Sequence, residues 1–258
     1  MNILIGDIGN TNTKICLVKK SNFKVIKMIN FNSKDIINNK EIIKKLKKFI
    51  LNRPISKSGL FSSVVPKYFF ALQRSIKKNF HVNLKEIKDK KIDKIVNIKV
   101  KNVRQLGSDR IANAVGVFKK YKINCIVVDL GTATTFDVIS KKGSYNGGII
   151  SPGIKLSIKS LSNTADQIPL FSLRKQKKII GKNTIEALQS GFYWGYTGLI
   201  NNIILKIESE TKKKYKVIFT GGYANLFKTS IQRPFVIDRN ITISGIIEIF
   251  KKNKKLFN

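Results

Sequence analysis

Two segments of the chain share one pattern. The first reads Ile5-Gly6-Asp7-Ile8-Gly9-Asn10-Thr11-Asn12-Thr13-Lys14 and the second reads Val128-Asp129-Leu130-Gly131-Thr132-Ala133-Thr134-Thr135-Phe136-Asp137. Each is an apolar run that ends in Asp-x-Gly and continues through small hydroxyl residues into another apolar run, which predicts a strand, a tight turn and a second strand. Glycine permits such a turn and lets a ligand approach the peptide N–H groups. We therefore expect two phosphate-binding turns, each with a carboxylate that can hold a metal ion or an attacking water.

The duplication indicates how the chain is divided. One Asp-Gly turn alone is weak evidence for a phosphate site, because any β-hairpin can use one. However, Asp7 and Asp129 are separated by about one modest domain length. We therefore expect an α/β protein of two similar domains, residues 1–118 and 119–258, each with a mixed β-sheet flanked by helices. Each domain would offer one turn to a shared phosphate chain.

Hydrophobic periodicity predicts the secondary structure of both halves. Strands are expected at 3–8, 14–19, 23–31, 60–65, 123–129, 134–140, 147–151, 215–219 and 235–237. Helices are expected at 33–50, from 66 onward, and at 108–118, 153–163, 184–211, 225–230 and 242–252. The Lys-rich segment 80–101 has irregular spacing and is expected to hold one or two short strands and a loop.

Composition excludes several kinds of site. The chain has one histidine, His81, and two cysteines, Cys16 and Cys125. A His/Cys zinc site and a Ser-His-Asp triad are therefore nearly excluded. Both cysteines fall in expected buried strands, which indicates reduced core thiols.

The formal net charge is +35, which raises the question of a nucleic-acid partner. The excess is almost entirely lysine, scattered along a chain rich in Ile and Asn, whereas arginine is scarce. This favours compositional bias, and we expect no nucleic-acid partner. Lys, Asn or Asp interrupts every apolar run, so we also expect no membrane partner. Residues 1–5 read as a strand rather than a signal peptide, which predicts a cytoplasmic protein.

Six segments carry a resemblance to a known family. They are Asp7 to Thr13, Gly107-Ser108-Asp109-Arg110, Asp129 to Thr135, Gly147-Gly148-Ile149-Ile150-Ser151-Pro152-Gly153, Gly181-Lys182-Asn183-Thr184 and Thr220-Gly221-Gly222-Tyr223-Ala224. In this order they resemble the type III pantothenate kinases of the acetate and sugar kinase, Hsp70 and actin superfamily. Val100 and Val103 stand where that family usually has Tyr and Pro.

The resemblance implies a fold, a reaction and a site. Two ribonuclease-H-like domains would clamp ATP, and the enzyme would phosphorylate pantothenate in the first step of coenzyme A biosynthesis as a homodimer. ATP would be bound by Asp7, Ile8, Gly9, Asn10, Thr11, Asn12, Thr13, Lys14 and Thr132, with magnesium near Asp7. Asp109 would be the catalytic base, and Gly107, Ser108, Asp109, Arg110 and Thr184 would bind pantothenate. Asp129 would bind a potassium or ammonium ion.

The residues themselves leave alternatives open. Arg110 should lower the pKa of Asp109 and keep it ionised, but Asp109 could instead cap the following helix. Thr184 also stands at an ordinary helix start. The whole chain could be an ATP-driven switch or regulatory module of the same fold, or a nucleic-acid-binding regulator, as its charge suggests.

Overall fold

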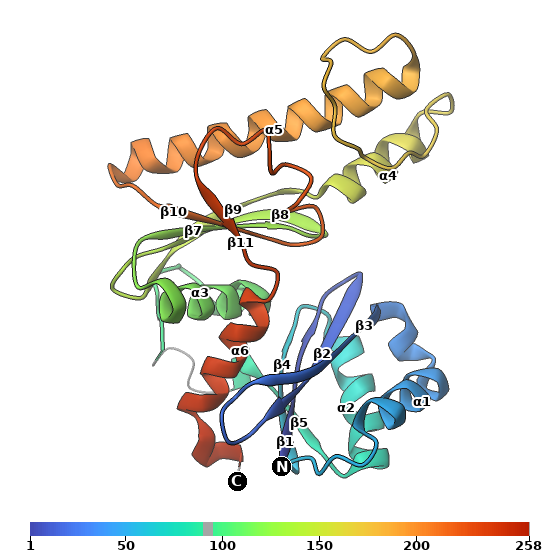
Figure 1. Ribbon diagram of the computed structural model, residues 1–258, viewed down its shortest axis with the longest axis vertical. Helices are drawn as coiled ribbons and strands as arrows, with labels where there is room; N and C mark the ends of the chain where they lie inside the picture. The colour runs from blue at the N-terminus through green and yellow to red at the C-terminus, as the bar shows by residue number, and fades with distance from the viewer. Residues whose placement is uncertain (90–94, 258) are drawn as a thin grey trace. The chain divides into compact units, whose positions relative to one another are not determined.

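The structure is a computed structural model that describes residues 1–89 and 95–257 and contains two compact units (Figure 1). The first comprises Met1–Lys122, Lys142–Tyr145 and Asn240–Asn258, and the second comprises Ile123–Lys141 and Asn146–Arg239. The last helix of the chain therefore belongs to the first unit, whereas the sequence alone assigns it to residues 119–258.

The first unit is built on a five-stranded sheet in the order β3-β2-β1-β4-β5. Its strands are β1 (Asn2–Ile8), β2 (Asn12–Lys19), β3 (Val25–Asn32), β4 (Ser58–Ser63) and β5 (Asn83–Glu86). The first three form an antiparallel meander, and β4 and β5 continue parallel to β1. In this register Asp7 on β1 lies beside Lys14 on β2 and Ser62 on β4.

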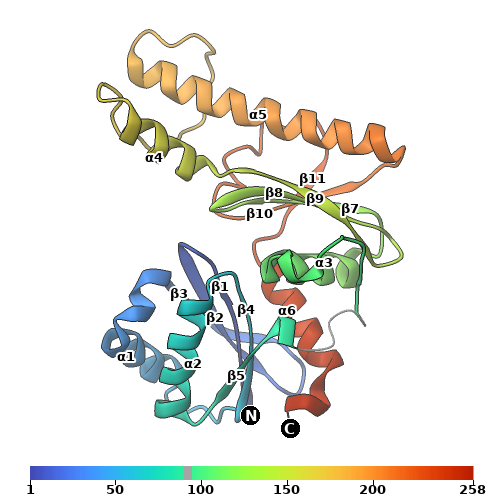
Figure 2. The same ribbon diagram turned by 180° about the vertical axis from the view of Figure 1, so that it is seen from behind.

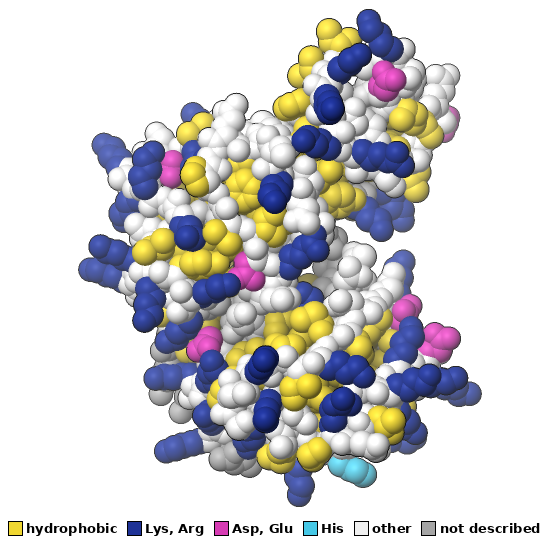
Figure 3. All heavy atoms as spheres, in the orientation of Figure 1, with side chains coloured by type: hydrophobic (Ala, Val, Ile, Leu, Met, Phe, Trp, Pro, Cys, Tyr) yellow, Lys and Arg dark blue, Asp and Glu magenta, His cyan; other side chains and the backbone are white. Residues whose placement is uncertain are grey.

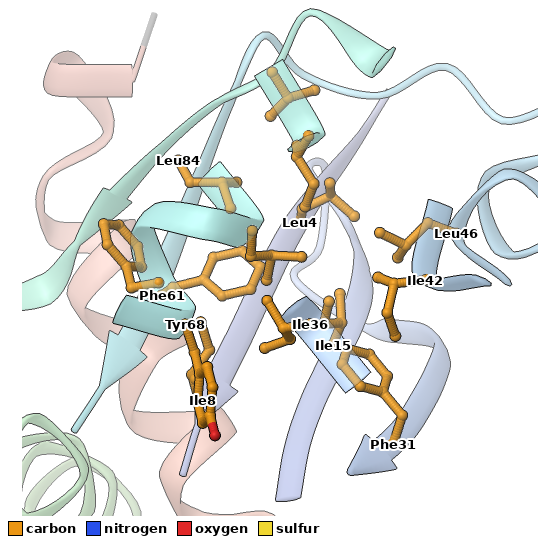
Figure 4. Packing of buried hydrophobic residues seen from close by; sticks show 14 of the residues in the cluster. Leu4, Ile8, Ile15, Phe31, Ile36, Ile42, Leu46, Phe61, Tyr68 and Leu84 are labelled. Atoms are coloured by element: carbon orange, nitrogen blue, oxygen red, sulfur yellow. The ribbon is translucent and has the colours of Figure 1, made fainter. Parts of the chain in front are cut away.

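Helices cover both faces of this sheet, as the opposite views show (Figures 1 and 2). On one face α1 (Asn39–Ile50) and α2 (Pro66–Phe80) bury an apolar cluster against the strands. Figure 4 shows strand residues Ile8, Ile15 and Phe61 in this cluster, with Ile42, Leu46 and Tyr68 from the helices. On the other face α6 (Ile241–Lys252) contacts β1 and β4, and α3 (Ser108–Tyr121) contacts β4.

The single helix expected at 33–50 is in fact two. A 3-10 helix, η1 (Ser33–Ile37), is separated from α1 by Asn38, whose backbone is not helical at φ −84° and ψ 77°. Asn32, rather than Ser33, caps η1 by accepting a hydrogen bond from the Lys34 N–H. Ser33 is instead bonded to the Thr13 hydroxyl at 2.9 Å. This tertiary hydrogen bond is not visible in the local pattern.

The second unit repeats the plan of the first. Its sheet contains β7 (Cys125–Leu130), β8 (Ala133–Ile139), β9 (Ser144–Pro152), β10 (Lys216–Thr220) and β11 (Phe235–Ile237). The short edge strand β6 (Asn97–Ile98) pairs with Ser144 and Tyr145 at the start of β9, and these residues, like β6, belong to the first unit. The order is β11-β10-β7-β8-β9-β6, so the strand after the meander again pairs parallel to the first strand. Two mixed sheets with flanking helices confirm the expected α/β fold class.

One face of the second sheet is covered by α4 (Ile154–Thr164) and α5 (Thr184–Thr211). Phe136 from β8 lies in one apolar cluster with Ile158 from α4 and with Tyr193 and Ile200 from α5. The helix expected at 225–230 is wrong, because residues 222–230 form consecutive turns. Within 80–101 the described part holds β5, β6 and a 3-10 turn, η2 (Ile87–Asp89), while 90–94 lie outside the described residues.

Close packing holds α6 against α3 within the first unit. A Cβ on Gly245 would collide with the Ala112 carbonyl, and one on Gly116 would lie 2.5 Å from the Ile241 carbonyl oxygen. The Thr242 hydroxyl also donates to Asn113 Oδ1 at 2.8 Å. Only glycines allow the two backbones to approach so closely. These contacts explain why the last helix joins the first unit.

The surface is rich in positive charge and the two thiols are buried, as the composition and the strand pattern predict. Lys and Arg side chains are spread over the face shown in Figure 3, with few acidic residues among them. Cys16 and Cys125 are buried free thiols, as expected. No helix in the described part of the chain is long and apolar enough to cross a membrane.

Candidate active site

The turn between β1 and β2 forms the first candidate phosphate site. Its backbone is held by a hydrogen bond from the Gly9 N–H to the Asn12 carbonyl at 3.0 Å and by one from the Ser33 N–H to the Thr11 carbonyl at 2.8 Å. The side chains of Asn10, Thr11 and Asn12 are exposed. The turn can therefore offer polar groups to a ligand without rearranging its strands.

Two of the expected ATP-binding residues face inward instead. The Ile8 side chain is fully buried in the core cluster, and the Thr13 hydroxyl is buried against Ser33. These two residues can contact a nucleotide only through their backbones. The sequence pattern therefore predicts the turn between β1 and β2, but it does not reveal which side chains of the turn are exposed.

Asp7 lies at the carboxyl end of β1, and its carboxyl group is enclosed by protein. Its pKa is raised from 3.8 to about 7, chiefly by burial and also by the negative charge of Asp109. The nearby Ser62 hydroxyl and the positive charge of Lys14 act against this shift. The first unit therefore brings together Asp7, Lys14 and Asp109, which are three of the residues expected to act on ATP and substrate.

Asp109 lies in the first turn of α3, where Gly107 is the N-cap residue. One carboxylate oxygen of Asp109 accepts the Arg110 N–H at 2.8 Å. Burial raises the pKa of Asp109, and this outweighs the opposing effects of the Arg110 N–H, the Arg110 charge and the Lys88 charge. Arg110 lowers the pKa of Asp109, as expected, but the expectation of a net lowered pKa is wrong, because the sequence does not reveal the burial of this carboxyl.

Arg110 is held beside Asp109 by an aromatic ring. Its guanidinium carbon lies 5.9 Å from the centre of the Tyr145 ring, which is almost completely buried. A guanidinium over an aromatic face is attracted by the ring's electron density. The arrangement fixes a permanent positive charge next to Asp109.

Glu86 forms a hydrogen-bonded cluster that the sequence did not reveal. Its carboxylate accepts the Ser108 hydroxyl at 2.5 Å, the Lys88 N–H at 2.7 Å and the Ser63 N–H at 3.4 Å. The Lys88 ammonium donates to the carbonyls of Arg104 and Leu106, at 2.8 and 3.0 Å. The Ser108 hydroxyl, expected to bind substrate, is thus buried against Glu86. The sequence feature that could have drawn attention to Glu86 is a rare acidic residue, one of only 15 in the chain, at the carboxyl end of a strand.

The second unit carries the second hairpin, with Asp129 at the end of β7 and Thr132 exposed in the turn. Two distant glycines pack against it. A Cβ on Gly153 would collide with the Thr132 carbonyl, and one on Gly221, whose φ is +86°, would lie 2.6 Å from Asp129 Oδ1. Three of the sequence segments therefore converge at this hairpin.

Thr184 is the first residue of α5, but it does not cap the helix. Asn183 does so, accepting the Glu186 N–H at 2.9 Å, while Glu186 accepts the Lys182 N–H at 2.8 Å. Thr184 lines a groove of about 970 Å³, whose other lining residues include Gly191, Gly195 and Tyr196. The expected site residue is therefore exposed and next to a concave surface.

The described residues show no cluster of three or more His, Cys, Asp and Glu side chains that could hold a metal ion. Magnesium does not need such a cage, because one or two carboxylates and the phosphates of a substrate usually bind it. Asp7 fits this role, since its enclosed carboxyl faces the charge of Asp109. A cation there would offset the repulsion that raises the Asp7 pKa.

Comparison with known proteins identifies the family. The profile of the type III pantothenate kinase family matches residues 3–206. The chain belongs to the type III pantothenate kinase family. A type III pantothenate kinase from Pelagibacter ubique is 46% identical over 245 residues, covering 95% of this chain and 97% of that protein. One from Halalkalibacterium halodurans is 40% identical over 194 residues, covering 75% and 76%.

Solved structures agree on the fold. A protein described as a Baf family transcriptional activator from Campylobacter jejuni has a TM-score of 0.62 and 23% identity, covering 98% of this chain and all of that one. The ethanolamine utilization protein EutJ from Carboxydothermus hydrogenoformans has a TM-score of 0.58 and 15% identity, covering 96% and 89%. At these identities the likeness concerns the fold alone, which is the actin-like ATPase fold.

Membership of this family identifies the reaction that the chain catalyses. Like other type III pantothenate kinases, the chain is an ATP-dependent phosphotransferase that phosphorylates pantothenate in coenzyme A biosynthesis. The expected family, reaction and cosubstrate are thereby confirmed. The comparisons do not assign the roles of individual residues, the ions or the oligomeric state, and our proposals for these are argued from the geometry of each unit.

Proposed function

We propose that Asp7 and Asp109 divide the two tasks of this kinase reaction. Asp109 accepts the proton of the primary hydroxyl of pantothenate, and Asp7 holds the magnesium ion that accompanies ATP. The observation that carries the proposal is that the first unit brings these two enclosed carboxylates within electrostatic range of each other. Phosphoryl transfer needs both groups near one point, because it depends on positioning and charge stabilisation.

The transfer itself is a displacement at phosphorus. The hydroxyl oxygen of pantothenate bonds to the γ-phosphorus, its proton passes to the Asp109 carboxylate, and the bond from the γ-phosphorus to ADP breaks. A raised pKa suits Asp109, since a general base works best when its pKa approaches the operating pH. A magnesium ion bound at Asp7 would supply positive charge to the phosphate oxygens.

The hairpin from Asp7 to Lys14 would hold the phosphates of ATP. Its exposed turn, Asn10 to Asn12, offers amide and hydroxyl groups, and Lys14 adds a positive charge opposite Asp7. Ile8, Gly9 and Thr13 contribute through the backbone. Fixed dipoles and one lysine are the usual parts of a phosphate cradle.

Pantothenate carries a negatively charged carboxylate, and the positive charge of Arg110 could bind it. The guanidinium is held over Tyr145 and lies beside the proposed base. A carboxylate bound by Arg110 would bring the hydroxyl end of the substrate toward Asp109. A Cβ on Gly107 would lie 2.5 Å from Asp109 Oδ1, so glycine leaves room for this carboxylate. Thr184 stays a predicted substrate-binding residue of the second unit.

The second hairpin would bind the monovalent cation and part of ATP. Asp129 supplies a carboxylate at a strand end, surrounded by the backbone of Leu130 and Gly221. Oxygen ligands of this kind suit potassium or ammonium, and the exposed Thr132 would contact ATP through its hydroxyl. The packing of Gly221 against Asp129 supports a fixed position for this carboxylate.

A homodimer would form through the groove on α5. The groove is lined mainly by apolar and small residues, and Cβ atoms on Gly191 and Gly195 would meet nothing within 4 Å. Such open, small-residue faces allow close approach of a second helix. The aromatic run beside it is partly core, since Tyr193 is buried and stacks on Phe227, with ring centres 5.6 Å apart.

A coupled assay with ATP, magnesium, pantothenate and potassium tests the residue roles. We expect Asp109→Asn to lower kcat about a hundredfold to ten-thousandfold, the usual effect of losing a general base, while ATP binding remains close to that of the parent. Asp7→Asn is the matched carboxylate control and should weaken magnesium-ATP binding itself. If Asp109→Asn keeps more than about a tenth of parental turnover, Asp109 is only a helix-terminal carboxylate. ATP turnover independent of pantothenate would favour a switch.

A further inference from the structure

We propose that Glu86 is a positioning residue that fixes the place of Asp109 through the Ser108 hydroxyl. This inference rests on the proposed role of Asp109 as the base. Glu86 accepts hydrogen bonds from Ser63, Lys88 and Ser108, and its effect is exerted through the residue that follows Ser108.

The contacts of Glu86 join the parts of the first unit that carry the two catalytic carboxylates. Ser63, whose N–H Glu86 accepts, follows Ser62, which lies beside Asp7 in the register of β1 and β4. Ser108, whose hydroxyl Glu86 accepts at 2.5 Å, directly precedes Asp109. One carboxylate therefore ties the end of β4 to the first turn of α3.

The start of α3 is not held by a side-chain cap. Its N-cap residue, Gly107, makes no side-chain capping bond. The approach to Gly107 is held by Lys88, which donates to the carbonyls of Arg104 and Leu106 and follows Glu86 by two residues. The short stretch from Glu86 to Lys88 thus holds both the segment before Gly107 and the hydroxyl after it.

The enclosure of Glu86 agrees with this role. Burial raises its pKa, and the Ser108 hydroxyl and the Lys88 N–H partly offset that effect. A carboxylate that is taken out of water must have its oxygens satisfied by fixed donors. The donors to Glu86 are Ser108, Lys88 and Ser63, and Ser108 directly precedes Asp109. A charge-assisted hydrogen bond is directional and strong, so it can fix the position of the residue that follows.

Four variants test the inference: Glu86→Ala, Glu86→Gln, Ser108→Ala and the double variant Glu86→Ala/Ser108→Ala. We expect each alanine variant to lower kcat on the order of tenfold, as for contacting residues that act together, with the KM for ATP and for pantothenate within about twofold of the parent. The double variant should be no slower than the slower single variant. Glu86→Gln should keep most of the activity, because its amide oxygen still accepts the Ser108 hydroxyl.

Glu248→Gln is the matched control, since Glu248 is a paired carboxylate of α6 in the same unit, and it should leave kcat unchanged. Each variant is assayed below its own melting temperature, and Ser108→Ala, which loses one oxygen atom, decides the matter if Glu86→Ala does not fold. Parental kcat in Ser108→Ala, or losses that multiply in the double variant, would overturn the inference. A rise confined to the KM for pantothenate in Ser108→Ala would mean that Ser108 binds substrate. Because Asp109→Asn is assayed alongside, failure of the base assignment is seen separately.

Discussion

The carboxylate of Asp109 raises the pKa of Asp7, although the two residues lie on different elements, α3 and β1, of the first unit. Burial is the larger cause, and the pKa of Asp7 is raised to about 7. The protein therefore holds a carboxyl group that changes its charge near neutral pH, at the point where we place magnesium.

The first prediction concerns stability without metal. Between pH 4 and 7 the folded state keeps the proton on Asp7, whereas the unfolded chain has lost it, so the folded state binds more protons and stability must fall as the pH rises through this range. Asp7→Asn removes this contribution. In EDTA at pH 8 we expect the variant to melt above the parent, by roughly 2–4 °C for each kcal/mol of strain relieved, and near pH 4 the two should be alike. Equal melting differences at both pH values would contradict the assignment.

The second prediction concerns the monovalent cation. Asp129→Ala removes the carboxylate that we propose as its ligand, so activity should fall and the remaining activity should no longer rise with potassium. Asp166→Ala, an exposed aspartate of the same unit, is the control. The measurement is turnover as a function of potassium concentration. A potassium dependence equal to that of the parent would show that the cation binds elsewhere.

The third prediction uses two neighbouring glycines. Gly221 has φ +86°, and an added Cβ would lie 2.6 Å from Asp129 Oδ1, whereas a Cβ on Gly222 would meet nothing within 4 Å. Gly221→Ala should therefore destabilise the protein by about 1–3 kcal/mol, as strained backbone positions do, and should weaken the response to potassium. Gly222→Ala should change neither. Thermal melting and potassium titration of both variants check this expectation.

The fourth prediction concerns assembly. We expect a dimer by light scattering at micromolar concentration, and Gly195→Arg should convert it to a monomer, because a long charged side chain would fill the α5 groove. Phe70→Arg places the same charge on an exposed apolar position of α2, in the first unit, and should leave the dimer intact. A parent protein that is monomeric under these conditions would refute the proposal.

Sequence patterns were most informative where the determinants are local. The two Asp-x-Gly turns, the Pro66 start of α2 and the full extent of α5 depend on neighbouring residues, and the structure has them where the sequence predicts. The family resemblance then supplied the reaction. These are the parts of the molecule in which a short stretch of chain determines its own conformation.

What the sequence did not predict depends on contacts between distant residues. The pKa of Asp109 is raised because the folded chain encloses it, which the adjacent Arg110 does not reveal. Glu86 was overlooked because its partners, Ser63 and Ser108, lie about twenty residues away on either side. The turns at 222–230 have helical composition, but their backbone hydrogen bonds do not form a continuous helix.

The return of α6 to the first unit affects how the protein is made. Its contacts with β1, β4 and α3 join the last helix of the chain to the earliest strands. During synthesis a ribosome exposes the N-terminal strands first, so one face of their sheet lacks α6 until residues 241–252 have been made. The first unit cannot complete its fold on the ribosome ahead of the second, and a chain released before residue 240 would expose that apolar face to chaperones and proteases.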